Sequence, residues 1–356
     1  MNRILNTNGG RGLVAILVLA LGGLTAPGLA PDVRAGSTER IGTNSAPELS
    51  INVGPRANAL GGNGVADVKG SESIYWNPAG LAVLNGTEAS FTHVSHIGET
   101  NVNYFSIATR AGSIGNLGFS AKVFSAGDVI VTTETAPDGT GEILSPTFAT
   151  IGVTYARQFT DRVRFGANMM FVNESIAEAH AKGIAFDFGF QYDTNEHGLV
   201  FGFSMKNFGP ALEYEGASFD VNTPPPGSEP GSSNRTLRFT TTENELPSYF
   251  QIGGAYNLWQ QGTDHRVQVL GTFTSNNFTP DDFRVGAEYK YRENLALRAG
   301  YNSFVSDTDL DTYDGISFGA GVGVPLGTAR LQFDYAQRMV NDWFGDTHEF
   351  GVRVLF

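Results

Sequence analysis

The stretch Asp282-Phe-Arg-Val-Gly-Ala-Glu-Tyr-Lys-Tyr-Arg292 alternates between apolar and polar or small side chains at every step. Successive side chains of an extended chain point to opposite sides, so a period of two predicts a β-strand with two unlike faces. The apolar face would carry Phe283, Val285, Ala287, Tyr289 and Tyr291. The same alternation recurs in 184–191, 316–323 and 330–335. The chain is therefore predicted to be all-β.

About fourteen segments with this alternation follow Thr87, which is an even number, as in bacterial membrane barrels. The predicted strands are 87–96, 101–110, 115–125, 147–158, 162–174, 181–192, 198–208, 247–258, 264–275, 282–292, 294–305, 315–325, 328–340 and 347–356. Pattern alone would also fit a soluble sandwich in which the apolar face is the interior. The lengths of the connections are needed to choose between the two.

The connections alternate between tight turns, such as 160–161 and 326–327, and long polar loops. The long loops are 126–146, 209–246, 306–314 and 341–346. Short turns on one side and long loops on the other are typical of outer-membrane barrels. We therefore predict a membrane-spanning antiparallel β-barrel of about fourteen strands. With a periplasmic amino terminus, every long loop would lie outside the cell.

Composition supports a barrel. The 356 residues include 45 Gly and 26 Phe, and only 17% of them are charged. After the first 35 residues no run of 18 apolar residues remains, so we expect no transmembrane helix, and only a closed barrel would satisfy the backbone in lipid. The chain has no cysteine, which excludes disulfides, thiol catalysis and a lipidated amino-terminal Cys.

Residues 1–35 have the features of a secretory signal peptide. Two arginines precede or flank the apolar run Leu13–Leu21, and small residues suited to cleavage after Ala30 or Ala35 follow. We place the chain in the outer membrane of a Gram-negative-type bacterium. Three parts are expected: a signal peptide (1–35), an amino-terminal plug segment (36–86) and the transmembrane barrel (87–356).

The plug is predicted because Gly54–Ala66 and Ser73–Ala82 do not alternate, and they are too poor in apolar residues to form a core of their own. Both stretches must therefore pack inside the barrel. Proline restricts the backbone on both sides of the Asn77-Pro78 bond, so this dipeptide is expected to form a fixed corner. The predicted plug residues are Arg56, Gly61, Gly62, Tyr75, Trp76, Asn77, Pro78, Ala79 and Gly80.

Within this set, Tyr75 and Trp76 would supply apolar bulk with a polar tip. Gly61 and Gly62 would let the backbone pass close to the wall.

The charged residues are distributed unevenly. The formal net charge is −13, and acidic residues predominate in the long loops. An acidic rim repels polyanions, so nucleic acid is not an expected partner. Inward strand positions carry the predicted lumen charges Arg284, Glu288, Arg330, Asp334 and Arg353. They would form either a fixed ion-pair network or an open anion channel; the network is favoured because buried charges are normally paired.

No feature predicts an enzyme. The six histidines show no metal-ligand spacing, and the chain has neither a Gly-x-Ser-x-Gly elbow nor a phosphate loop. No catalytic residue, metal or cofactor is predicted. The last strand, 348–356, places apolar residues on one face and ends on Phe356. We interpret this end as a carboxy-terminal signal for outer-membrane assembly.

Gly54-Pro-Arg-Ala-Asn-Ala-Leu-Gly-Gly62 and Ile74-Tyr-Trp-Asn-Pro-Ala-Gly-Leu-Ala82 resemble the PorV/PorQ family, a branch of the FadL-like outer-membrane barrels. The resemblance implies a fourteen-stranded barrel with an amino-terminal segment inside. FadL-like members carry hydrophobic small molecules, such as fatty acids or aromatic hydrocarbons. PorV-like members serve type IX secretion, where the barrel binds the carboxy-terminal signal domain of exported cargo and accompanies the translocon.

Three functions follow as hypotheses, since one fold hosts many functions. The first is non-enzymatic protein export, in which the barrel contacts outer-membrane lipid and binds secretion components or cargo carboxy-terminal domains. The alternative is transport of a hydrophobic ligand, which predicts an apolar pocket near Tyr75 and Trp76 and a break in the barrel wall. The third is a purely structural protein with a sealed lumen.

Overall fold

The computed structural model describes residues 40–229, 231–262, 264–304, 315–340 and 345–356. The predicted signal peptide, 1–35, lies outside the described residues, as do the whole of the acidic loop 306–314 and part of 341–346.

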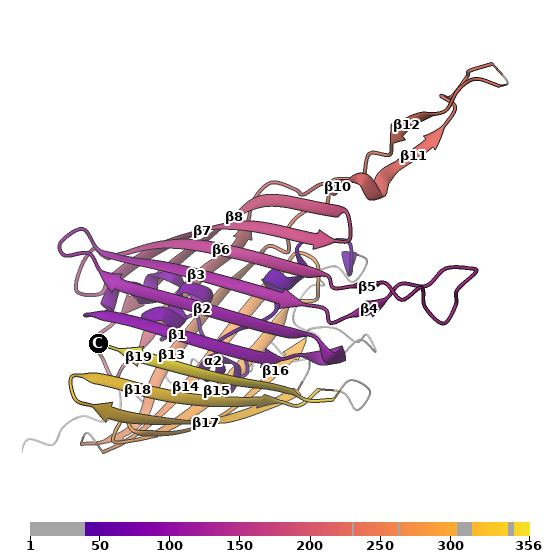
Figure 1. Ribbon diagram of the computed structural model, residues 1–356. Coiled ribbons are helices and arrows are strands. Elements are labelled where there is room, and N and C mark those ends of the chain that lie inside the picture. The colour runs from indigo at the N-terminus through magenta and orange to yellow at the C-terminus, as the bar shows by residue number, and fades with distance from the viewer. Residues whose placement is uncertain (1–39, 230, 263, 305–314, 341–344) are drawn as a thin grey trace, which may run out of the picture. The chain divides into compact units, whose positions relative to one another are not determined.

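Fourteen strands of the described chain form one closed antiparallel barrel, so the predicted fold class is confirmed (Figure 1). Each strand pairs with its neighbours along the chain, and β1 closes the barrel by pairing with β19. The strands are β1 (Thr87–Ser95), β2 (Asn101–Arg110), β3 (Asn116–Ser125), β6 (Thr147–Gln158), β7 (Val163–Ile176), β8 (Ala179–Asp193), β9 (Val200–Phe208), β13 (Tyr249–Gln261), β14 (His265–Asn276), β15 (Asp282–Tyr291), β16 (Leu295–Phe304), β17 (Gly315–Leu326), β18 (Ala329–Arg338) and β19 (Thr347–Leu355).

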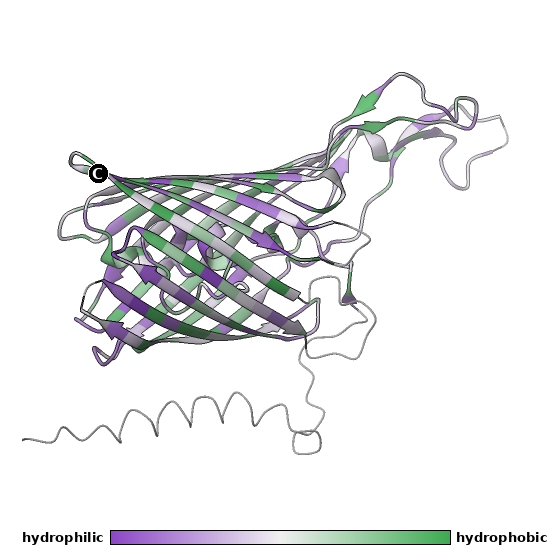
Figure 2. Cartoon of the chain, turned by 90° about the horizontal axis from the view of Figure 1, so that it is seen from below, coloured by the Kyte–Doolittle hydropathy of each residue, from purple (hydrophilic) through white to green (hydrophobic). Residues whose placement is uncertain are grey.

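The outer wall of the barrel is apolar and the inner wall is polar, as the alternation predicts. Figure 2 shows hydrophobic and hydrophilic residues following each other along the strands. On β15, Val285 is 50% exposed on the outer face, whereas Glu288 on the inner face is 1% exposed. Such an outer wall suits hydrocarbon. Among the described residues, no helix has the length and apolar character needed to cross a membrane.

Long connections leave the barrel at one end and carry small elements of their own (Figure 1). Two of them contain separate two-stranded sheets, β4–β5 and β11–β12. The elements are η5 (Ile97–Glu99), β4 (Val129–Ile130), β5 (Ile143–Leu144), β10 (Glu215–Gly216), η6 (Ala217–Phe219), β11 (Asp220–Thr223) and β12 (Arg235–Arg238). At the other end the turns are tight; Arg292 and Glu293 both adopt positive φ in the turn between β15 and β16.

Short helical turns of the plug segment lie inside the barrel, and side chains such as Leu60 and Ile74 are fully buried there. These elements are η2 (Pro47–Ser50), α2 (Pro55–Asn58), η3 (Gly70–Glu72), α3 (Ser73–Trp76) and η4 (Pro78–Val83). None exceeds six residues, and helices this short are unstable in isolation. The barrel wall therefore has to supply the contacts that hold them.

The plug segment runs through the lumen from one end to the other. At the long-loop end, Arg40 Nη1 donates to Asn277 Oδ1 at 2.8 Å, in the connection between β14 and β15. At the tight-turn end, Asn116 Nδ2 donates to the Leu84 carbonyl at 3.0 Å. The described chain thus begins at the long-loop end and reaches β1 from the tight-turn end. The placement of the long loops outside the cell stays a prediction.

Carboxy-terminal Phe356 pairs with the first strand. Its backbone N–H donates to the Thr87 carbonyl at 2.8 Å, and its side chain is 66% exposed. The assembly signal at Phe356 stays a prediction.

Placing a charge on the outer wall tests whether this wall faces lipid. Val285→Arg on β15 should lower the free energy of unfolding by roughly 2–4 kcal/mol, because the guanidinium would lie in hydrocarbon. The control is Val221→Arg on β11, a valine of similar exposure outside the barrel sheet, which should change little. Urea unfolding in lipid vesicles measures both. Equal effects of the two variants would contradict a lipid-facing wall.

Candidate functional site

The corner at Asn77 connects the plug segment to itself and to the wall. Asn77 lies between α3 and η4 with an extended backbone, and its side chain is fully buried. Its Oδ1 accepts from the Ala79 N–H at 3.1 Å, which caps η4. Its Nδ2 donates to the Val65 carbonyl at 2.6 Å and faces the carbonyls of Phe190 and Phe203 on β8 and β9. One amide therefore holds three parts of the chain together.

The wall opposite this corner has glycines at the points of closest approach. Gly166 on β7, Gly189 on β8 and Gly202 on β9 point inward, and a Cβ on any of them would collide with the plug segment. At Gly189 the colliding atom is Oδ1 of Asn77. The glycines thus let backbone pack directly against backbone.

A second close approach occurs at Gly61 and Gly62. Both have positive φ, +76° and +86°, which favours glycine. A Cβ on Gly61 would come within 2.9 Å of the Tyr301 backbone, and one on Gly62 within 2.7 Å of Arg284 Nη1. Across from them Gly300 on β16 is equally crowded. The plug backbone therefore lies directly on the wall here.

Tyr75 fills the centre of the lumen between two lysines. Its hydroxyl donates to the Ile51 carbonyl at 3.0 Å, and the Nζ atoms of Lys122 and Lys206 lie 5.0 and 4.6 Å from its ring centroid. Lys206 pairs with Asp187 at 2.8 Å and donates to the Tyr75 carbonyl. The cavity beside Tyr75 is about 20 Å³ and is lined partly by these charged groups. It is too small to be the apolar pocket that the transport hypothesis predicts.

Trp76, next in the chain, is 1% exposed and packs edge-on against Tyr75, with ring centroids 5.2 Å apart. Gly54 and Gly64 of the plug leave the space that its indole occupies. Pro78 lies against Gly166, and Gly80 lies against the Val68 carbonyl. Tyr75 and Trp76 therefore serve as packing groups inside the plug.

A chain of buried ion pairs joins the plug to the wall. Arg56 on α2 contacts Asp67 at 2.7 Å and Glu288 at 3.0 Å. Arg298 contacts the same Glu288 at 2.8 Å and Asp334 at 2.6 Å. All of these side chains are less than 10% exposed. Charges buried so deeply are tolerated because they are paired with one another.

The five predicted lumen charges therefore separate into three places. Glu288, Asp334 and Arg353 belong to the ion-pair chain, with Arg353 3.6 Å from Asp334. Arg284 pairs with Asp282 at 2.6 Å and donates to the Gly62 carbonyl at 3.2 Å. Arg330 lies at the tight-turn end, where it donates to Asn294 Oδ1 at 3.1 Å.

Two acids of the plug segment, Asp67 and Glu72, were not singled out from the sequence. Burial raises the pKa of Glu72, while the nearby guanidinium of Arg353, 3.9 Å away, opposes that shift. The sequence did hold a signal for them, because an acidic residue in a segment enclosed by the barrel needs a basic partner. The partner itself could not be named without knowing which strands surround the plug.

A cavity of about 250 Å³ lies above the plug at the long-loop end of the lumen. Its plug side includes Ile51 and Asn58, and its wall side includes Tyr249, Arg284, Phe304 and Glu349. The lining combines apolar, amide and charged groups. The cavity is thus large enough for a side chain or a short segment of a partner.

Comparison with known proteins identifies the family of the chain. The family model described as "Type IX secretion system protein PorV" matches residues 34–226, more than half of the chain. Among curated proteins, none has a matching sequence.

Several solved structures share the fold. The toluene transporter TbuX of Ralstonia pickettii is 14% identical with a TM-score of 0.52; the comparison covers 85% of this chain and 97% of that one. The CymD monoaromatic hydrocarbon channel is 13% identical with a TM-score of 0.52, covering 85% and 96%. A Pseudomonas aeruginosa FadL homologue is 10% identical with a TM-score of 0.51, covering 85% and 98%. At these identities the likeness concerns the fold alone.

Removing the shared carboxylate tests the ion-pair chain. Glu288→Gln would leave the buried guanidinium groups of Arg56 and Arg298 without their common counterion, so we expect a loss of about 3–5 kcal/mol in the free energy of unfolding. Glu293→Gln, at a side chain 53% exposed, is the control and should cost less than about 1 kcal/mol. Denaturant unfolding in vesicles measures both losses. Equal losses in the two variants would contradict the ion-pair network.

Adding one methyl group to an inward glycine tests the close approach of the plug to the wall. Gly189→Ala places its Cβ against Asn77, so overpacking should destabilise the barrel by roughly 1–3 kcal/mol. Gly254→Ala on β13 is the matched control, because the nearest atoms to its Cβ are 3.9 Å away. Thermal unfolding monitored by the electrophoretic shift of the folded barrel compares the two. A stable Gly189→Ala barrel would rule out close contact at this corner.

Proposed function

Because the chain belongs to the PorV family of type IX secretion system proteins, we propose that it is a non-enzymatic outer-membrane barrel of a Gram-negative-type bacterium that serves protein export. In this proposal it binds the carboxy-terminal signal domain of exported cargo or another component of the secretion system. Its outer wall contacts the lipid of the membrane. No catalytic residue, metal or cofactor takes part.

The observation that carries the proposal, beside the family, is the way the lumen is filled. Buried ion pairs hold the plug segment to the wall at Glu288, and bare glycines receive it at Asn77. A lumen filled in this way favours a barrel that works through its end surfaces. The long-loop end offers such surfaces, since it carries two small sheets and the cavity of about 250 Å³.

The β4–β5 hairpin is the part of that end best suited to a protein partner. Val129, Ile130 and Ile143 are 48%, 59% and 61% exposed on it. Apolar side chains that stand in water on a projecting hairpin favour contact with another protein surface. We propose that this hairpin takes part in cargo or translocon binding.

Transport of a hydrophobic small molecule is the second candidate. The cavity at the long-loop end supports it, because Ile51, Val94 and Phe304 supply apolar lining. The wall argues against it. Within the described strands the hydrogen-bonded ladders shift register only between β13 and β14 and between β8 and β9, and neighbouring strands remain paired all the way round.

A binding experiment separates the candidates. The purified barrel should capture carboxy-terminal signal domains of exported proteins, and Ile130→Asp with Ile143→Asp should weaken capture about tenfold or more by removing an apolar contact. Val221→Asp, on the other small sheet, is the control. No capture, together with normal secretion in a deletion strain, would overturn the export proposal. Uptake of toluene-like compounds that depends on the barrel would then favour transport.

A further inference from the structure

Two buried carboxyl groups face each other between the plug segment and the wall. Glu48 on η2 is 1% exposed and Glu174 on β7 is fully buried. None of their four side-chain oxygens meets a partner at full hydrogen-bond geometry within the described part of the chain, although the Tyr214 hydroxyl, the Ala46 backbone and the other carboxyl group lie in interaction range of Glu174. The two groups nevertheless interact electrostatically with each other. Buried polar groups without partners are rare enough to need a specific explanation.

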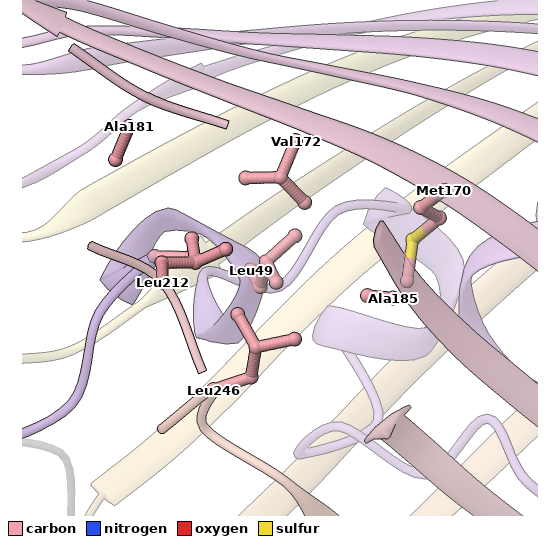
Figure 3. Close-up of a cluster of buried hydrophobic side chains, with 8 residues drawn as sticks. Leu49, Met170, Val172, Ala181, Ala185, Leu212 and Leu246 are labelled. Atoms are coloured by element: carbon pink, nitrogen blue, oxygen red, sulfur yellow. The ribbon is translucent and has the colours of Figure 1, made fainter. Parts of the chain in front are cut away.

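The pair lies at an apolar junction of three parts of the chain. Leu49 of η2 packs against Met170 and Val172 of β7, and against Leu212 and Leu246 from the two ends of the long connection between β9 and β13 (Figure 3). Ser45 adds polar contacts, since its N–H donates to the Glu245 carbonyl at 3.0 Å. The junction therefore decides whether the start of the plug stays attached to the wall and to the long connection.

The charged and titratable groups around the pair do not neutralise it. From β3, Lys122 Nζ donates to the backbone carbonyls of Glu48 and Ile51, both at 2.6 Å, and forms no ion pair with either carboxyl group. From the long connection, the Tyr214 hydroxyl interacts with Glu174, but a neutral phenol does not cancel a carboxylate charge. Two carboxylates this close in an apolar site cannot both be ionised without a large cost, so a proton shared between them is the stable arrangement.

We propose that Glu48 and Glu174 form a proton-dependent latch, which holds η2 against β7 and the long connection when the pair carries a proton and releases η2 when the proton is lost. Pro47, Ser50 and Ile51 line the cavity of about 250 Å³, so release of η2 would widen that cavity at the long-loop end. The latch does not depend on the export function proposed above.

The direction of the pH dependence follows from the environment of Glu48. Burial, and then the charge of Glu174, raise the pKa of Glu48 from 4.5 to about 8. A carboxyl group whose pKa is higher in the latched state binds its proton more tightly there. The latch is therefore fully formed below about pH 4.5 and is lost as the pH rises toward about pH 8.

The test uses the absence of cysteine from the natural sequence. Ala185→Cys places a thiol on β8 under the junction, at a site that is fully buried while the latch is closed. The maleimide labelling rate of Ala185→Cys in lipid vesicles is divided, at each pH, by that of Ser113→Cys in an exposed turn. This labelling ratio cancels the pH dependence of thiol reactivity itself. The labelling ratio should rise about tenfold per pH unit between about pH 5 and about pH 8, as expected for one proton.

Variants assign the effect to the pair. Glu48→Gln combined with Glu174→Gln should abolish the rise, because neither amide can lose a proton. Glu142→Gln, at an exposed acid of the loop 126–146, should leave it unchanged. A flat ratio in the Ala185→Cys barrel without other changes would overturn the latch, and so would a rise that persists when both glutamates are replaced by glutamine. The first outcome needs no variant of the pair and so holds even if the glutamine variants fail to fold.

Discussion

The carboxylate of Glu288 receives Arg56 from the plug segment and Arg298 from the neighbouring strand, and this shared contact joins the inside of the barrel to its wall. The barrel makes such a contact necessary. A strand that faces lipid on one side must turn its polar residues inward, where a narrow lumen removes them from water. Each buried charge then needs a partner, and the plug brings Arg56 and Asp67 to meet that need.

The glycines of the inner wall make the same arrangement sterically possible. At Gly166, Gly202 and Gly300 the plug backbone lies where a Cβ would otherwise stand. Short helical turns without a core of their own become ordered because they are enclosed this closely. The buried ion pairs and the inward glycines therefore act together. The ion pairs attach the plug to the wall, and the glycines let the plug come close enough for those pairs to form.

A barrel filled in this way is suited to working at its ends. The plug crosses the lumen from Arg40 at the long-loop end to Leu84 at the tight-turn end, so its first residues share one surface with the long connections. Any partner bound at that end would contact the plug and the loops together. The junction at Glu48 and Glu174 is the place where a change in the loops would reach the plug.

Much of the fold followed from the sequence by itself. The period of two, the even number of strands and the alternation of turns with long loops are local properties, so they predicted the barrel of Thr87–Leu355 and its two unlike faces. The stretches around Asn77 and Gly61 also showed which residues would lie inside, because neither could be a strand.

Only the tertiary structure decided which groups meet. Strand order alone does not say how far the plug is displaced along the axis, so the pairing of Arg56 with Glu288, rather than with another acid, could not be predicted. For the same reason Arg330 was grouped with the lumen network, although it lies at the tight-turn end. The facing of Glu48 and Glu174 joins residues far apart in the chain, and such contacts leave no local pattern in a sequence.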